Sequence, residues 1–131
     1  MKKIITAAVL SLLPAMLYAT NFTAPELTAA ERESMSGVGC SFEERGRLIA
    51  AHGFQTLVFN HQYMSAQDDE VNTDNAYFSD GRNSVSLILK NRIHHHSSEG
   101  SGWSSSNRYQ LIYSVNNRPV YSTEVIGTCG D

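Results

Sequence analysis

Apolar and aromatic residues recur at every second position along much of the chain after residue 37, between clusters of Gly, Asn, Asp and Ser. A period of two is typical of strands that bury one face. Two turn signals organise the pattern, Asp80-Gly81 and the run 116–119, because Asn, Asp and Gly tolerate the positive φ of tight hairpins. We therefore predict strands at 54–59, 76–79, 84–90, 109–115 and 121–125, the last four forming two hairpins.

The two cysteines lie near opposite ends of the predicted β domain, which spans residues 37–131. Cys40 is in an early strand and Cys129 follows the last one. In an oxidising compartment such a pair favours an intramolecular disulfide. The bond would hold the first strand beside the last, which closes an antiparallel meander into a barrel and hides its edges. The predicted fold is a small antiparallel barrel, with a two-sheet sandwich as the alternative.

Residues 1–19 have the layout of a secretory signal peptide. Lys2 and Lys3 precede an apolar stretch that ends in small residues, and cleavage is predicted after Ala19. A membrane anchor is the competing interpretation, but the stretch is shorter than the roughly 20 apolar residues of a spanning helix and contains Pro14. We expect a periplasmic or secreted protein without a membrane span.

The segment 20–36 differs in composition from the rest of the chain, because it is rich in Ala, Glu and Thr. Thr28 and Glu31, like Thr23 and Glu26, have the spacing of a capping box, in which a hydroxyl and a carboxylate satisfy free amides of the first helical turn. Few apolar residues are present to form a buried stripe. The segment is predicted to be an N-terminal arm with a short helix, loosely attached to the β domain.

The net charge and the length of the chain limit the partners and the number of domains that it can have. The chain contains 10 basic and 13 acidic residues, and removal of the two lysines of the signal peptide leaves 8 against 13, a net charge of −5. Such a chain is a poor partner for nucleic acid. The roughly 112 residues that remain suffice for one domain and are too few for two.

Two polar segments interrupt the strand pattern and are predicted to be loops, at 62–75 and 94–107. The second begins with three histidines, and in an extended chain His94 and His96 face the same way and so are able to share a metal such as zinc. The site needs a third ligand, which the spacing does not identify. A solvated polar loop is the competing interpretation.

Signals for other chemistry are weak. In the first loop, counting from Asp68, the glycine and the carboxylate of a helix-loop-helix calcium site are replaced by Thr73 and Ser79. No Gly-x-Ser-x-Gly elbow is present. Glu43 and Glu44 would alternate between the faces of a strand and are predicted to be surface charges. We expect no catalytic residue and no cofactor.

The single tryptophan, Trp103, lies within the Gly- and Ser-rich part of the second loop. Because an exposed tryptophan is costly in water, it either folds back onto the barrel or anchors a partner. In the second case the binding surface is the segment 99–109. Its candidate binding residues are Ser101, Gly102, Trp103, Arg108 and Tyr109.

Together these features resemble small uncharacterised secreted β proteins of Gram-negative bacteria. The shared features are the signal peptide, Gly-x-Gly-Cys at 37–40, the Asp80-Gly81 hairpin and a terminal Gly-Thr-Cys-Gly at 127–130. The chain is also similar, more weakly, to the periplasmic C-type lysozyme inhibitors, which are small disulfide-closed β barrels with an inhibitory Ser-Gly loop before an aromatic residue. Ser101-Gly102-Trp103 carries this similarity, with Tyr109 as the following tyrosine.

We therefore expect a noncatalytic periplasmic or secreted binding protein with a protein partner in the cell envelope. The resemblance implies an inhibitor or immunity protein that acts against a cell-wall-active enzyme. The alternative is a metal-binding or small enzymatic envelope protein that uses the histidines at 94–96.

Overall fold

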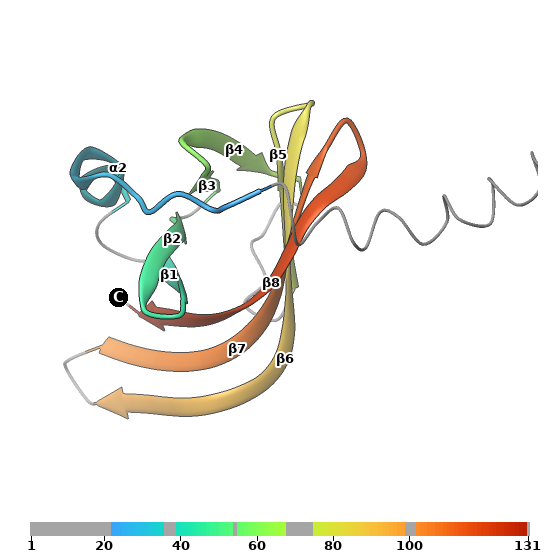
Figure 1. Cartoon of the computed structure of the whole chain (residues 1–131). Coiled ribbons are helices and arrows are strands. Elements are labelled where there is room, and N and C mark those ends of the chain that lie inside the picture. Colours follow the sequence, from blue (N-terminus) through green and yellow to red (C-terminus); the bar gives the residue numbers. More distant parts are fainter. Residues whose placement is uncertain (1–21, 36–38, 54, 68–74, 99–101, 131) are drawn as a thin grey trace, which may run out of the picture.

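The computed structural model describes residues 22–35, 39–53, 55–67, 75–98 and 102–130. This part forms a closed antiparallel barrel of eight strands, each paired with its neighbour in the chain and the last paired with the first (Figure 1). The barrel prediction is confirmed, and the chain does not form the two-sheet sandwich. The predicted signal peptide, residues 1–19, lies outside the described residues.

The strands differ greatly in length. They are β1 (Gly39–Glu44), β2 (Arg47–His52), β3 (Thr56–Phe59), β4 (Gln62–Ala66), β5 (Asn75–Ser79), β6 (Asn83–Ser98), β7 (Gly102–Val115) and β8 (Arg118–Gly130). One short helix, α2 (Ala29–Ser34), precedes them in the described part. No helix among the described residues is long and apolar enough to cross a membrane.

The barrel closes between β1 and β8. Residues 39–43 of β1 lie opposite residues 130–126 of β8, and Cys40 and Cys129 are directly opposed and form the predicted disulfide. The two cysteines are 89 residues apart in sequence. In the chain-entropy model, closing so long a loop stabilises the fold by about 4 to 5 kcal/mol.

Tight turns gather at one end of the barrel. The two-residue turns Arg45-Gly46, Asn60-His61 and Asn116-Asn117 all have positive φ at both residues, as type I′ hairpins require. In the Asp80-Gly81 hairpin, the Asp80 carboxylate accepts hydrogen bonds from the backbone amides of Arg82 and Asn83. We call this the tight-turn end. At the opposite, disulfide end, β1 begins and β8 finishes.

Aromatic and aliphatic side chains fill the barrel. The largest fully buried ones include Phe42, Phe59, Phe78, Leu57, Met64, Leu87 and Leu111. Tyr109, Leu111 and Tyr113 of β7 face the interior together with Val125 of β8. Gly127 packs directly against two of these rings. A Cβ at this position would come within 2.6 Å of Tyr109 and 2.7 Å of Phe42, so there is no room for a side chain.

The N-terminal arm is firmly packed, which corrects the prediction of loose attachment. The ring of Phe22 lies 4.9 Å from that of Tyr121 and 5.2 Å from that of Tyr113, so it covers the tight-turn end of the core. Ala24 is fully buried, and its carbonyl accepts a hydrogen bond of 2.7 Å from Arg47. Further along, the Leu27 amide donates to the Leu48 carbonyl. Aromatic contacts and backbone pairing therefore replace the helical stripe that the arm lacks.

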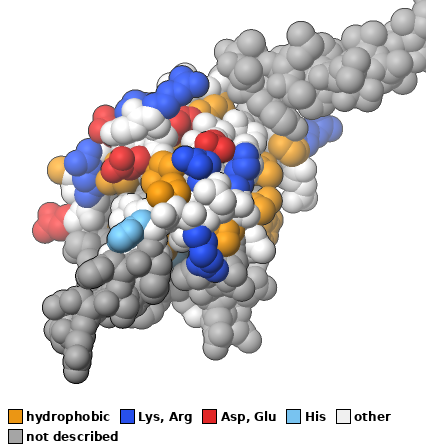
Figure 2. Space-filling model, turned by 90° about the horizontal axis from the view of Figure 1, so that it is seen from below, with side chains coloured by type: hydrophobic (Ala, Val, Ile, Leu, Met, Phe, Trp, Pro, Cys, Tyr) orange, Lys and Arg blue, Asp and Glu red, His pale blue; other side chains and the backbone are white. Residues whose placement is uncertain are grey.

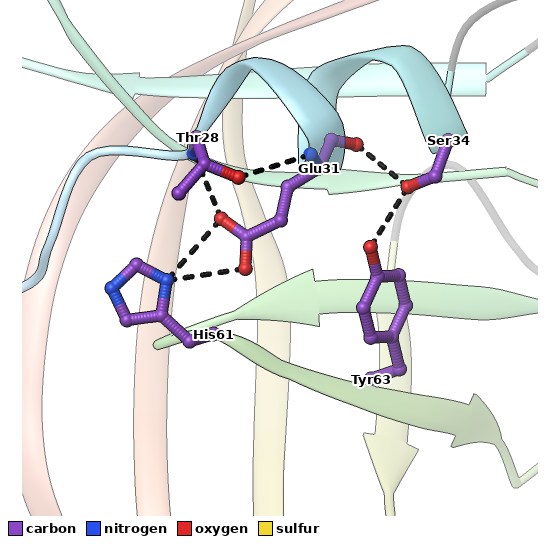
Figure 3. A network of polar contacts seen from close by, with 5 residues as sticks. All are labelled: Thr28, Glu31, Ser34, His61 and Tyr63. Carbon is purple, nitrogen blue, oxygen red and sulfur yellow. Dashed lines mark hydrogen bonds and ion pairs between the residues drawn. The ribbon is translucent and has the colours of Figure 1, made fainter.

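Helix α2 is held at both ends (Figure 3). Thr28 and Glu31 form the predicted capping box, with the Thr28 amide donating to the Glu31 carboxylate at 2.8 Å. The same carboxylate lies 3.1 Å from Nδ1 of His61 in the β3–β4 turn. Near the end of the helix, Ser34 Oγ lies 2.9 Å from the Tyr63 hydroxyl. The other predicted capping box, Thr23 to Glu26, is not in a helix.

Under the arm, the outer face of β2 and β3 is apolar. Ala51 and Val58 point outward and are buried by Leu27, with Met35 and Leu48 at the margin. Because β2 is buried on both faces, its sequence lacks the alternation of a half-exposed strand. The arm therefore covers this side of the barrel from the outside.

Both segments that were predicted to be loops are strand in much of their described length. Gln62–Ala66 is β4, whereas residues 68–74 lie outside the described residues. In the second segment, residues 94–98 of β6 oppose residues 106–102 of β7. Polar composition concealed these strands, because backbone pairing across a ladder does not require apolar side chains.

We predict that Gly127→Ala destabilises the barrel by about 1 to 3 kcal/mol, because the added methyl collides with two buried rings. Urea unfolding followed by circular dichroism measures the change. The exposed neighbour Thr128 gives the control Thr128→Ala, which should change stability little. Equal stability of Gly127→Ala and the parent protein would contradict the packing described.

We predict that Glu31→Gln destabilises the protein by about 1 kcal/mol at pH 7. Burial opposes ionisation of Glu31, but hydrogen bonds from Thr28 and His61 outweigh it and place the pKa of Glu31 below its ordinary value. The carboxylate therefore stabilises the fold above the unfolded pKa of about 4.3, and this contribution is lost as the pH falls through the lower folded pKa.

Urea unfolding at pH 7 and near pH 3 tests this, and the difference between Glu31→Gln and the parent should shrink at the lower pH. Glu43→Gln removes the same charge from an exposed position and serves as the control. A difference that stays constant with pH would show that the carboxylate charge is not what holds α2.

Candidate functional site

The tight-turn end is closed by a polar network. The Tyr113 hydroxyl donates to Oδ1 of Asn83 at 2.8 Å, and the Tyr121 hydroxyl donates to the Glu44 carboxylate. Burial and this carboxylate raise the pKa of Tyr121. Glu44 is buried and lies 3.6 Å from Arg47, so the prediction of a surface charge at this position was wrong. These polar groups bind one another by hydrogen bonds and an ion pair, and we assign them a structural role.

The interior at the disulfide end is more polar. His52 is buried between the rings of Phe42 and Phe78, and burial lowers its pKa. Asn107 is 2% exposed; its Nδ2 donates to the Tyr109 hydroxyl at 3.4 Å, and its Oδ1 has no hydrogen-bond partner among the residues that the structure describes. A buried water is the usual partner of such an acceptor.

Strands β6 and β7 sweep toward the disulfide end as one long curved hairpin (Figure 1). Among the described residues, the pairing of β5 with β6 reaches Ile88, and β6 itself continues to Ser98. Register shifts between Leu89 and Asn91, and again between Arg92 and His94, mark bulges, which bend a strand. The bend accounts for the curvature of this hairpin.

The candidate binding residues do not form one cluster. Arg108 faces outward, where its Nε lies 3.2 Å from Glu124. Tyr109 faces inward and is 2% exposed, with its ring 5.5 Å from that of Phe42. Gly102 and Trp103 begin β7, and Ser101 lies outside the described residues. The structure thus places Arg108 and Tyr109 on opposite faces, and only the residues at the start of β7 lie next to the hairpin tip.

The histidine run lies in β6. His94 opposes Ser106 and His96 opposes Ser104, whereas His95 between them opposes the buried Ser105. His94 and His96 are therefore two positions apart along one strand, with His95 between them. Within the described residues, no three His, Cys, Asp or Glu side chains are grouped so as to hold a metal ion.

A row of small polar residues crosses four strands on the outer face. Ser41 of β1, Thr128 of β8, Ser106 of β7 and His94 of β6 are successive cross-strand partners. Ser106 Oγ and Thr128 Oγ1 lie 3.5 Å apart. In the next row, Gly39 and Gly130 are paired. The sheet backbone is therefore thinly covered here.

A pocket of about 250 Å³ lies between the end of α2 and this outer face; we call it the α2 pocket. It is lined by Arg32, Met35, Gly39, Cys40, Ser41, Leu48, Ala51, Thr128 and Gly130. Arg32 pairs with Glu26 at 3.4 Å, and both side chains are about half exposed. The sequence prediction missed this pocket, because its lining comes from four segments that only the arm and the β1–β8 pairing bring together.

Exposed large hydrophobic side chains are scattered on the barrel exterior. They are Tyr63, Tyr77, Ile88 and Ile93. In the face of Figure 2, hydrophobic side chains lie in small groups between Lys and Arg side chains. On the exterior of β6, β7 and β8, Lys90 and Arg108 both pair with Glu124.

Comparison with known proteins gives no relative. No family model matches the chain, and neither a curated protein nor a solved structure matches it. The resemblances to secreted β proteins and to C-type lysozyme inhibitors therefore stay predictions.

Proposed function

We propose that the protein is a noncatalytic binding protein of the periplasm or the secreted fraction, and that it acts as an inhibitor or immunity protein against a cell-wall-active enzyme. The long β6–β7 hairpin carries the proposal. β6 with 16 residues and its partner β7 with 14 are far longer than the five-residue strands β4 and β5. Such a hairpin offers a partner a long paired element of the sheet.

The scaffold beneath the hairpin is stiff, which favours binding. β7 pairs with β8 as far as Ser104 opposite Gly130, and β8 is joined to β1 by the disulfide. A preorganised element loses little conformational entropy when a partner binds it. We therefore propose Trp103, which follows Gly102 at the start of β7, as the anchor, because aromatic residues dominate the energy of many interfaces.

We predict that the parent protein inhibits a C-type lysozyme and that Trp103→Ala weakens this inhibition at least about thirtyfold, the effect of losing a hot-spot residue. A lysozyme activity assay on cell-wall suspensions measures the inhibition. A pull-down from envelope extract then identifies the natural partner. Thermal unfolding of the variant checks that the barrel is intact.

Tyr77→Ala is the matched control, because Tyr77 is an exposed aromatic residue on β5 and not on the hairpin. It should inhibit as the parent does. Inhibition that survives Trp103→Ala would remove the hairpin tip from the interface. If the parent protein inhibits no wall hydrolase and captures no envelope protein, the proposed function is wrong.

The second candidate function is metal binding at the histidine run, favoured by the position of His94 and His96 two residues apart along one strand. Zinc titration by calorimetry on metal-stripped, untagged protein should then show tight stoichiometric binding, weakened about tenfold or more by His94→Ala or His96→Ala. His95→Ala is the control, since that position lies between the two in the strand. Micromolar or weaker affinity in the parent, or equal loss in all three variants, would end this candidate.

A further inference from the structure

The α2 pocket has one apolar wall. Met35 at the end of the arm helix and Leu48 and Ala51 of β2 form it, and they belong to the packed layer between the arm and the barrel. An apolar ligand group that packs against this wall is removed from water. The wall therefore suits a small apolar side chain.

The other side of the pocket is polar and open. Ser41 and Thr128 bring hydroxyls, and the paired glycines Gly39 and Gly130 also line it. At Gly39 the missing side chain is required by the neighbouring strand, since a Cβ there would come within 2.2 Å of the His52 carbonyl oxygen, so it is at Gly130 that a ligand is able to approach the backbone closely. Hydroxyl and backbone groups of this kind form hydrogen bonds with a peptide unit or with a carboxylate.

Arg32 supplies the only charge in the described lining, and the structure already shows what it binds. Its guanidinium lies 3.4 Å from the Glu26 carboxylate, with both side chains about half exposed. An exposed pair of this kind is weak and exchanges readily. Glu26 therefore marks the place of a carboxylate beside the pocket and also competes for it.

We propose that the α2 pocket binds the free C-terminal carboxylate of a short peptide, with Arg32 pairing with the carboxylate and the apolar wall receiving the last side chain. A volume of about 250 Å³ is below the range of roughly 300 to 1,000 Å³ that is typical for drug-sized ligands, so one terminal residue fills it. An arginine fork matches the geometry of a carboxylate.

The pocket is held in shape before any ligand arrives. Contacts of Glu31 with His61 and of Ser34 with Tyr63 fix α2 on the barrel, while the disulfide fixes β1 against β8. Both walls of the pocket are thereby anchored. The proposal does not depend on the hairpin tip, so it stands or falls separately from the inhibitor function.

The test uses acetyl-Ala-Ala as probe, with its C-terminal amide as the matched ligand, in a ¹⁵N NMR titration of the full mature chain. The free acid should shift the amide signals of Gly39, Ser41, Thr128 and Gly130. The amide should bind at least about fivefold more weakly, because it lacks the charge-assisted hydrogen bonds to Arg32.

Variants make the test two-sided. Arg32→Gln should weaken binding at least about fivefold, whereas Glu26→Gln should strengthen it about twofold by removing the competing carboxylate. Arg118→Gln, at the tight-turn end, is the control for loss of a positive charge. Thermal unfolding of each variant verifies the fold.

Equal affinity for the acid and the amide would overturn the proposal. So would unchanged binding in Arg32→Gln, weaker binding in Glu26→Gln, or an absence of shifts at about 10 mM probe, which corresponds to affinity too weak for a specific site. Shifts confined to the hairpin would also overturn it, and would assign carboxylate binding to a different surface.

Discussion

The pairing of β1 with β8 is the constraint on which the rest of the structure depends. Residues at the two ends of the domain meet there, and the disulfide joins two directly opposed positions. Without this pairing both strands would be open edges, which invite association with other chains. The row from Ser41 to His94 and the α2 pocket both cross this seam, so the exterior that we interpret functionally exists only when the barrel is closed.

The N-terminal arm solves two packing problems at once. Phe22 covers one end of the core, and Leu27 covers the outward side chains of β2 and β3. These strands carry Ala51 and Val58 on a face that would otherwise meet solvent. The arm also builds one wall of the α2 pocket, so a segment that stabilises the barrel at one point shapes a binding surface at another.

Sequence reasoning succeeded where the signal was local. The positive φ of the turn at Asn116-Asn117, the Asp80-Gly81 hairpin and the alternation of β7 are properties of neighbouring residues, and the two cysteines reported the closure directly. β2 was missed because both of its faces are buried. The strands at 94–98 and 102–107 were missed because a backbone ladder leaves no apolar period. The α2 pocket has no sequence signature, since its residues meet only after folding.

Closing the first strand against the last has a consequence for how the chain is made. During synthesis β1 leaves the ribosome well before its partner, residues 126–130. The barrel therefore cannot close until these residues have been made, and folding of such long-range contacts is slow. Removal of residues 126–130 would leave the rest of β8 paired with β7 but would open the barrel between β1 and β8, so closure of the domain depends on the last part of β8.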